Sequence, residues 1–167
     1  MRHQWVVLVF AGFIMAGCLP ESATKSEAGI MTGWVQPKVF MTDPGHASFR
    51  ERYDTVTVDT NLSGMLRQMS AGVEVLVFYG SWCGDSRREV PHFLKIAEAA
   101  AWDPKRIQYY ALDRSKESND GTTEKYSIQH VPTIIFLRNG TEIGRIVESP
   151  QTTLEGDMVK ILASQTH

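Results

Sequence analysis

Cysteine is scarce in this chain of 167 residues, which contains only Cys18 and Cys83. Small secreted domains that lack a sufficient core are held together by several disulfides. Two cysteines exclude a framework of that kind. A folded part of about 150 residues buries roughly 68–70% of the surface of its unfolded chain, so it does not need one.

An excess of charge of one sign is also missing. Lys and Arg number 17 against 19 Asp and Glu, a net charge of −2. Without a basic excess to neutralise phosphates, the composition argues against a nucleic-acid partner. We expect no metal and no cofactor, because a lone pairing of His130 with Cys83 would not make a zinc site. His130 is expected to face solvent, and His92 and Arg88 to be exposed helix residues. The histidines without ligand spacing are His3, His46, His92, His130 and His167.

No apolar segment is long enough for a simple membrane span. Residues 5–17 form thirteen positions without a charge, after a short start that carries Arg2. A spanning helix needs about 20 such residues, whereas the apolar part of a secretory signal needs about 7–15. The sequence therefore predicts a signal peptide over residues 1–17.

The end of this segment resembles the bacterial lipobox. Met15-Ala16-Gly17 precedes Cys18, with methionine where the lipobox usually has leucine. The resemblance implies cleavage before Cys18 and lipidation of that residue, and several acyl chains anchor a protein stably where one does not. Because Leu19 is not the aspartate associated with inner-membrane retention, we expect the outer membrane, on its periplasmic side. The alternative is an ordinary secreted protein in which Cys18 is incidental.

Residues 18–45 are interpreted as the lipidated cysteine, a tether and a segment that leads into the domain. The tether, residues 19–29, is small and polar, whereas residues 30–41 are apolar again and are expected to pack on the domain. Thr42-Asp43-Pro44-Gly45 is a turn signal.

Residues 46–167 alternate between helical and strand patterns. Residues 73–79 are almost continuously apolar, as is typical of a central strand covered on both faces. The alternation predicts an α/β domain with a mixed central sheet and helices on both faces. Helices are expected at 46–53, 62–69, 84–101, 123–128 and 153–163, and strands at 55–58, 73–79, 107–112, 131–137 and 142–147.

The turn after residues 73–79 carries the chemistry. Trp82-Cys83-Gly84-Asp85-Ser86 ends a buried strand and opens a helix, and in this it resembles the active site of the thioredoxin family. Pro91 stands where that family kinks the helix. Val131-Pro132-Thr133 matches the family's cis-proline loop, and residues 136–140 match the hairpin after it. The resemblance spans about residues 55–165.

This resemblance implies a thioredoxin-like fold in which Pro132 is cis and faces Cys83. It assigns the chemistry to Cys83 and Ser86. Its substrate groove would be formed by Trp82, Gly84, Asp85, Val131 and Pro132.

Two positions depart from the thioredoxin pattern. Ser86 replaces the second cysteine, and Val77 stands where thioredoxins have a buried acid. The fold therefore carries over, but the dithiol reaction does not.

Cys83 alone is still predicted to be reactive. A helix N-terminus presents unpaired N–H groups and the positive end of the helix dipole, both of which favour a thiolate. We expect the Ser86 hydroxyl to donate a hydrogen bond to the sulfur. Arg87 and Arg88 add positive charge nearby, and Asp85 opposes it.

Two classes of function remain open. The first is thiol-disulfide exchange through Cys83 alone, by a monomer anchored through its lipid and acting on envelope proteins with thiols or disulfides. The second is a non-catalytic module that binds partner peptides between Trp82 and the Val131-Pro132 loop. A peroxidase is a poor third, because the threonine and arginine setting of a peroxidatic cysteine is not visible. A Cys83→Ala variant that still binds partners would favour the module.

Overall fold

The computed structural model describes residues 23–26 and 29–164. The predicted signal peptide and Cys18 lie outside this part of the chain. The strands of the described part are β1 (Thr24–Lys25), β2 (Met31–Val35), β3 (Val73–Tyr79), β4 (Ile107–Ala111), β5 (Thr133–Arg138) and β6 (Thr141–Val147). Its α-helices are α1 (Val39–Thr42), α2 (Ala47–Thr55), α3 (Thr60–Met69), α4 (Gly84–Ala99), α5 (Thr122–Lys125) and α6 (Leu154–Ala163).

The strands form one mixed sheet in the order β1-β2-β4-β3-β5-β6. Strand β3 runs parallel to β4 and antiparallel to β5, and Val77 pairs with Tyr109 on one side and Ile134 on the other. The expected central strand is therefore confirmed, with the bounds that the apolar pattern predicted.

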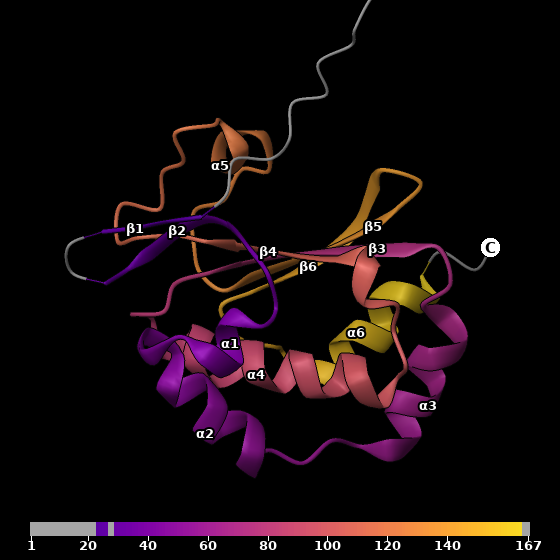
Figure 1. Ribbon diagram of the computed structural model, residues 1–167. Helices are drawn as coiled ribbons and strands as arrows, with labels where there is room; N and C mark the ends of the chain where they lie inside the picture. The colour runs from indigo at the N-terminus through magenta and orange to yellow at the C-terminus, as the bar shows by residue number, and fades with distance from the viewer. Residues whose placement is uncertain (1–22, 27–28, 165–167) are drawn as a thin grey trace, which may run out of the picture.

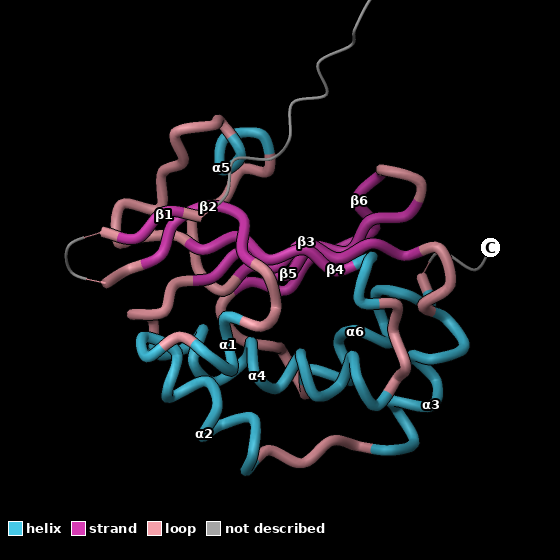
Figure 2. Tube along the Cα trace, in the orientation of Figure 1, coloured by secondary structure: helices cyan, strands magenta, loops and turns pink. Residues whose placement is uncertain are grey.

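Helices cover the two faces of the sheet unequally. Figures 1 and 2 show α1, α2, α3, α4 and α6 together on one face and the short α5 on the other. Because side chains alternate along a strand, Val75, Val77 and Tyr79 point into the core under the five helices. Leu76 and Phe78 point into a second, smaller cluster. The prediction of helices on both faces is confirmed.

The segment that leads into the domain belongs to this fold. Strand β2 pairs with β4, and Trp34 contacts the ring of Tyr110 edge-on at a centroid distance of 4.9 Å. Val35 and Phe40 are buried in the larger core. The expectation that residues 30–41 pack on the domain is confirmed. The tether expected over residues 19–29 is wrong at Thr24–Lys25, because these residues form β1 and pair with β2.

The strand predicted at residues 55–58 is wrong. Helix α2 continues to Thr55, whose hydroxyl donates to the Glu51 carbonyl, and Val56 N–H donates to the Arg52 carbonyl. The segment then runs to Asp59, which caps α3 by accepting from Asn61 N–H. β-branched residues favour strands only where a neighbouring strand is available for pairing, and this segment lies in the helical layer.

Candidate functional site

Cys83 is the residue that caps the N-terminus of α4. Its φ of −84° and ψ of 130° are extended, and helical geometry begins at Gly84. Cys83 N–H donates to the Gly80 carbonyl at 3.0 Å, which closes a tight turn between β3 and α4. The sulfur is half-buried, and Gly84 beside it is exposed. This turn leaves one side of the sulfur open to a partner.

The cis-proline loop faces this sulfur, as the resemblance predicted. The Val131–Pro132 peptide bond is cis, and the Cys83 thiol donates to the Val131 carbonyl with 3.1 Å between sulfur and oxygen. Thr133 Oγ1 donates to the His130 carbonyl at 2.7 Å and fixes the loop from its other side. The predicted contact between Cys83 and Pro132's loop is confirmed.

Ser86 does not bond to the sulfur, so that expectation is wrong. Its side chain is fully buried, and its hydroxyl oxygen accepts a hydrogen bond from Gly80 N–H at 3.2 Å. The buried amide of the turn needs an acceptor, and the hydroxyl one turn into α4 supplies it. Ser86 therefore holds the turn in place beneath Cys83.

Trp82 is fixed by three contacts, none of which the sequence revealed. Its Nε1–H donates to the Leu112 carbonyl at 2.9 Å, and the Arg114 guanidinium lies over the ring, 4.9 Å from the centroid. A Cβ at Gly80 would meet the indole at 2.7 Å, so any larger residue there would displace the ring. Gly80 and Arg114 are site residues whose roles depend on this tertiary contact.

Asp85 opposes the arginine charge beside Cys83, as expected, because it pairs with Arg88. The Arg88 guanidinium donates to Glu89 at 2.6 Å and to Asp85 at 2.7 Å, and these bonds, Glu89 first, raise the pKa of Arg88. Asp85 and Arg88 thus largely cancel each other. Arg87 instead folds back, and its Nε–H donates to the Ser81 carbonyl at 2.8 Å.

Val77, which stands where thioredoxins have a buried acid, is fully buried. Buried polar side chains do lie on the same face of β3, but they belong to Tyr79 and to its neighbour His46. The Tyr79 hydroxyl lies 3.0 Å from His46 Nε2, and His46 Nδ1 lies 3.2 Å from the Asp43 carboxylate. Burial raises the pKa of Tyr79 and lowers that of His46. Burial also raises the pKa of Asp43, but hydrogen bonds from Lys25 and His46 outweigh it and hold the value below normal.

The other histidines divide between the two expectations. His130 is exposed, as predicted, and lies 3.3 Å from Glu148. The prediction that His92 is exposed is wrong. Its side chain is 16% exposed and its Nε2 lies 3.1 Å from the buried Glu155, because the start of α6 covers this face of α4. Within residues 23–26 and 29–164, no three His, Cys, Asp or Glu side chains are grouped so that they could hold a metal ion.

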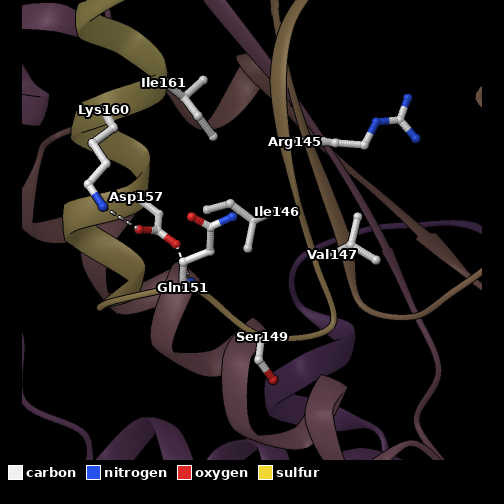
Figure 3. Close-up of a pocket in the computed structure, with 8 residues that line it drawn as sticks. All are labelled: Arg145, Ile146, Val147, Ser149, Gln151, Asp157, Lys160 and Ile161. Carbon is white, nitrogen blue, oxygen red and sulfur yellow. Dashed lines mark hydrogen bonds and ion pairs between the residues drawn. The ribbon is translucent and has the colours of Figure 1, made fainter.

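A pocket of about 440 Å³ lies between β6 and α6, and Cys83 is not among the residues that line it (Figure 3). Asp157 points between Lys160 and Gln151, accepting a hydrogen bond from each, and it also accepts from the Thr152 hydroxyl. Burial raises the pKa of Asp157, but the bonds from Thr152 and Gln151 N–H outweigh it and keep the value low. This cluster closes the N-terminal turn of α6, and we assign it no reaction.

A cysteine at the start of a helix, opposite a cis-proline loop on a mixed sheet, defines a thioredoxin-like protein. The thioredoxin family model matches residues 36–162. The chain therefore belongs to the thioredoxin family.

Named relatives agree with this assignment. An H-type thioredoxin of Oryza sativa subsp. indica is 32% identical over 98 residues, 58% of this chain and 75% of that protein. A probable protein disulfide-isomerase A4 of Caenorhabditis elegans is 31% identical over 117 residues, 70% of this chain but 17% of that protein. A solved Pseudomonas aeruginosa protein of unknown function matches with a TM-score of 0.56 and 14% identity, covering 73% of this chain and 86% of that one. That last match concerns the fold alone.

Proposed function

We propose that this thioredoxin-family chain performs thiol-disulfide exchange through Cys83 alone. The observation that carries the proposal is the half-buried sulfur at the N-terminus of α4, 3.1 Å from the carbonyl of the cis-proline loop. The position that would hold a second thiol is the fully buried Ser86. The site therefore offers one sulfur to a partner.

The first step is an attack of the Cys83 thiolate on a partner disulfide. A bond forms between Cys83 and one partner sulfur, the partner's S–S bond breaks, and the other sulfur leaves as a thiolate that takes up a proton. Unpaired N–H groups at the helix N-terminus stabilise the thiolate before it attacks.

The second step needs a thiol from the partner, because Ser86 cannot attack the mixed disulfide. When a different thiolate of the same partner attacks, a new partner disulfide forms and Cys83 is released as a thiolate. The sum of the two steps is an isomerisation with no net oxidation, so it requires no further reductant. Reduction of a partner to a dithiol would instead require an external thiol.

The proposed location is the bacterial cell envelope. A signal peptide over residues 1–17 and lipidation of Cys18 would anchor the domain to the outer membrane, facing periplasmic proteins with thiols or disulfides. No helix of the described chain is long and apolar enough to cross a membrane. Mass spectrometry of the membrane fraction should yield an acylated peptide that begins at Cys18, and a free Cys18 thiol would contradict this.

The second candidate is a module that binds peptides without catalysis. It is favoured by the backbone of Val131, since its N–H makes no hydrogen bond within the described residues. An extended partner strand could pair there, beside Trp82.

The experiment compares wild type with Ser86→Cys and with Cys83→Ala as the control. Wild type should accumulate mixed disulfides through Cys83 in cells, whereas Ser86→Cys should clear them by intramolecular attack, at an effective thiol concentration of about millimolar or more. Turnover of a protein disulfide with a regenerating reductant should therefore rise in Ser86→Cys. If wild type traps no more partner than Cys83→Ala, but both still bind peptides, the binding module is the function.

A further inference from the structure

Arg114 lies at the edge of the site without an acidic partner. Its guanidinium carbon is 4.9 Å from the centroid of the Trp82 ring, and the side chain is exposed. Within the described residues it makes no ion pair and no hydrogen bond. A guanidinium that stacks on an aromatic face keeps its in-plane N–H donors free for an anion.

The ring of Trp82 holds this guanidinium at the turn that carries the reacting sulfur. Trp82 directly precedes Cys83, and both side chains pack against the smaller apolar cluster. The indole cannot easily turn away, because its Nε1–H donates to the Leu112 carbonyl at 2.9 Å. Arg114 is therefore displayed at a fixed edge of the site.

Arg87 places a second guanidinium beside the same turn. Its Nε–H donates to the Ser81 carbonyl at 2.8 Å, and its backbone N–H donates to the Cys83 carbonyl. The side chain is exposed, and its terminal nitrogens make no hydrogen bond to any described residue. Two guanidinium groups with free donors thus contact the turn that carries Cys83, Arg114 at Trp82 and Arg87 at Ser81.

The carboxylates nearby are already engaged. Asp85 accepts from Arg88 at 2.7 Å, and Glu148 lies 3.3 Å from His130. The Asp113 carboxylate accepts from the backbone N–H and the hydroxyl of Ser115. None of these groups is paired with Arg114 or Arg87.

We propose that Arg114, assisted by Arg87, makes Cys83 select partners that carry a carboxylate beside the reacting sulfur. The inference rests on the proposed exchange reaction and adds its substrate class. The substrates are partners in which a carboxylate lies close to the reacting thiol or disulfide. The carboxylate meets the guanidinium while the Cys83 thiolate attacks the adjacent sulfur. Charge complementarity of this kind raises encounter rates and rejects like-charged partners.

The test uses three 2-pyridyl disulfides that release the same pyridine-2-thione and differ only in the other half. That half carries a carboxylate, a hydroxyl or an ammonium group, and each rate is divided by the rate of free cysteine with the same probe. Wild type should favour the carboxylate over the ammonium probe by about tenfold at low salt. The preference should shrink at about 1 M salt, where the Debye length is about 3 Å.

The variants separate charge selection from a general effect on the site. Arg114→Gln should remove most of the preference, Arg114→Glu should reverse it, and Arg114→Lys should retain part of it. Arg67→Gln, which changes an exposed arginine on α3, is the matched control and should leave the ratio unchanged. A change of all three rates by one factor would mean that Arg114 only positions Trp82, and it would overturn the inference.

Failure of the inference and failure of the proposed function give different results. Reaction with all three probes at equal normalised rates would overturn charge selection and leave exchange through Cys83 standing. No release of thione by wild type beyond that of Cys83→Ala would overturn the exchange reaction and the selection together.

Discussion

The two faces of the sheet are built in different ways. The face under the five helices holds the larger core, and the His46 and Tyr79 side chains buried there are hydrogen-bonded to each other. The opposite face is covered by α5 and by loops, and there Trp82 and Cys83 are half-buried on a smaller apolar cluster. The first face supplies most of the burial that stabilises the domain, and the second leaves a reactive group accessible on a rigid support.

This difference separates stability from chemistry. A substitution in the helical face should lower the free energy of unfolding while the site stays intact in the molecules that remain folded. A substitution under Trp82 should change the reactivity of Cys83 at a smaller cost in stability.

The largest effect is expected for Phe40→Ala in the helical face. Phe40 is 1% exposed, and its ring centroid lies 5.1 Å from those of both Tyr79 and Tyr109. Removing such a ring leaves a cavity and costs about 3–5 kcal/mol. Urea unfolding followed by circular dichroism measures the change.

Met41→Ala is the matched control, since this neighbouring side chain is 43% exposed. It should change the free energy of unfolding by no more than about 0.5 kcal/mol. Equal losses of unfolding free energy in Phe40→Ala and Met41→Ala would mean that α1 does not contribute to the core. The contrast between the two faces of the sheet would then not hold for α1.

A smaller effect is expected for Gly80→Ala beneath Trp82. The new methyl group would meet the indole at 2.7 Å and force it away from the Leu112 carbonyl. We expect a loss of about 1–3 kcal/mol from overpacking, with a shift in tryptophan fluorescence and a changed rate of Cys83 alkylation.

Gly64→Ala provides the control, because an added Cβ there has no atom within 4 Å. Inside α3 this change should stabilise the protein by about 0.5–1 kcal/mol, and the rate of Cys83 alkylation should stay unchanged. A Gly80→Ala variant with unchanged stability and unchanged tryptophan fluorescence would show that the Trp82 indole does not pack against residue 80.

Local pattern predicted the central parts of the fold. Residues 73–79 and the hairpin around Asn139-Gly140 are recognisable because apolar period and turn residues act over a few positions. Strand β2 was not predicted as a strand, since its partner β4 lies more than 70 residues further along the chain. The segment at 55–58 shows the converse, a local strand preference with no neighbour to pair with.

The site divides in the same way. Cys83 and Pro132 could be assigned because their residue types and order match a known family. The contacts of Arg114 with Trp82, and of His46 with Tyr79, join residues more than 30 positions apart in unrelated segments. Nothing in the local sequence sets those distances, so only the fold reveals these groups.

The smallest effect concerns pH and the buried His46. Its imidazole lies between the Tyr79 hydroxyl and the Asp43 carboxylate. Burial lowers the pKa of His46, and this effect outweighs the Asp43 carboxylate, which raises it. The charges of Lys25 and Arg50 lower the pKa further. The unfolded chain then binds a proton near its ordinary pKa of about 6.5, before the folded chain does, so the free energy of unfolding should fall as the pH falls.

One proton limits this slope to about 1.4 kcal/mol per pH unit below about pH 6.5. His46→Gln should be less stable at neutral pH because it loses one contact, but it should show a flatter profile between about pH 7.5 and pH 5. Asp43→Asn should keep or steepen the slope, since it removes the carboxylate that favours the proton on His46. Urea unfolding across this pH range measures the free energy of unfolding of wild type, His46→Gln and Asp43→Asn. A His46→Gln profile as steep as that of wild type would place the titrating group elsewhere, and the helical face would no longer account for the acid sensitivity.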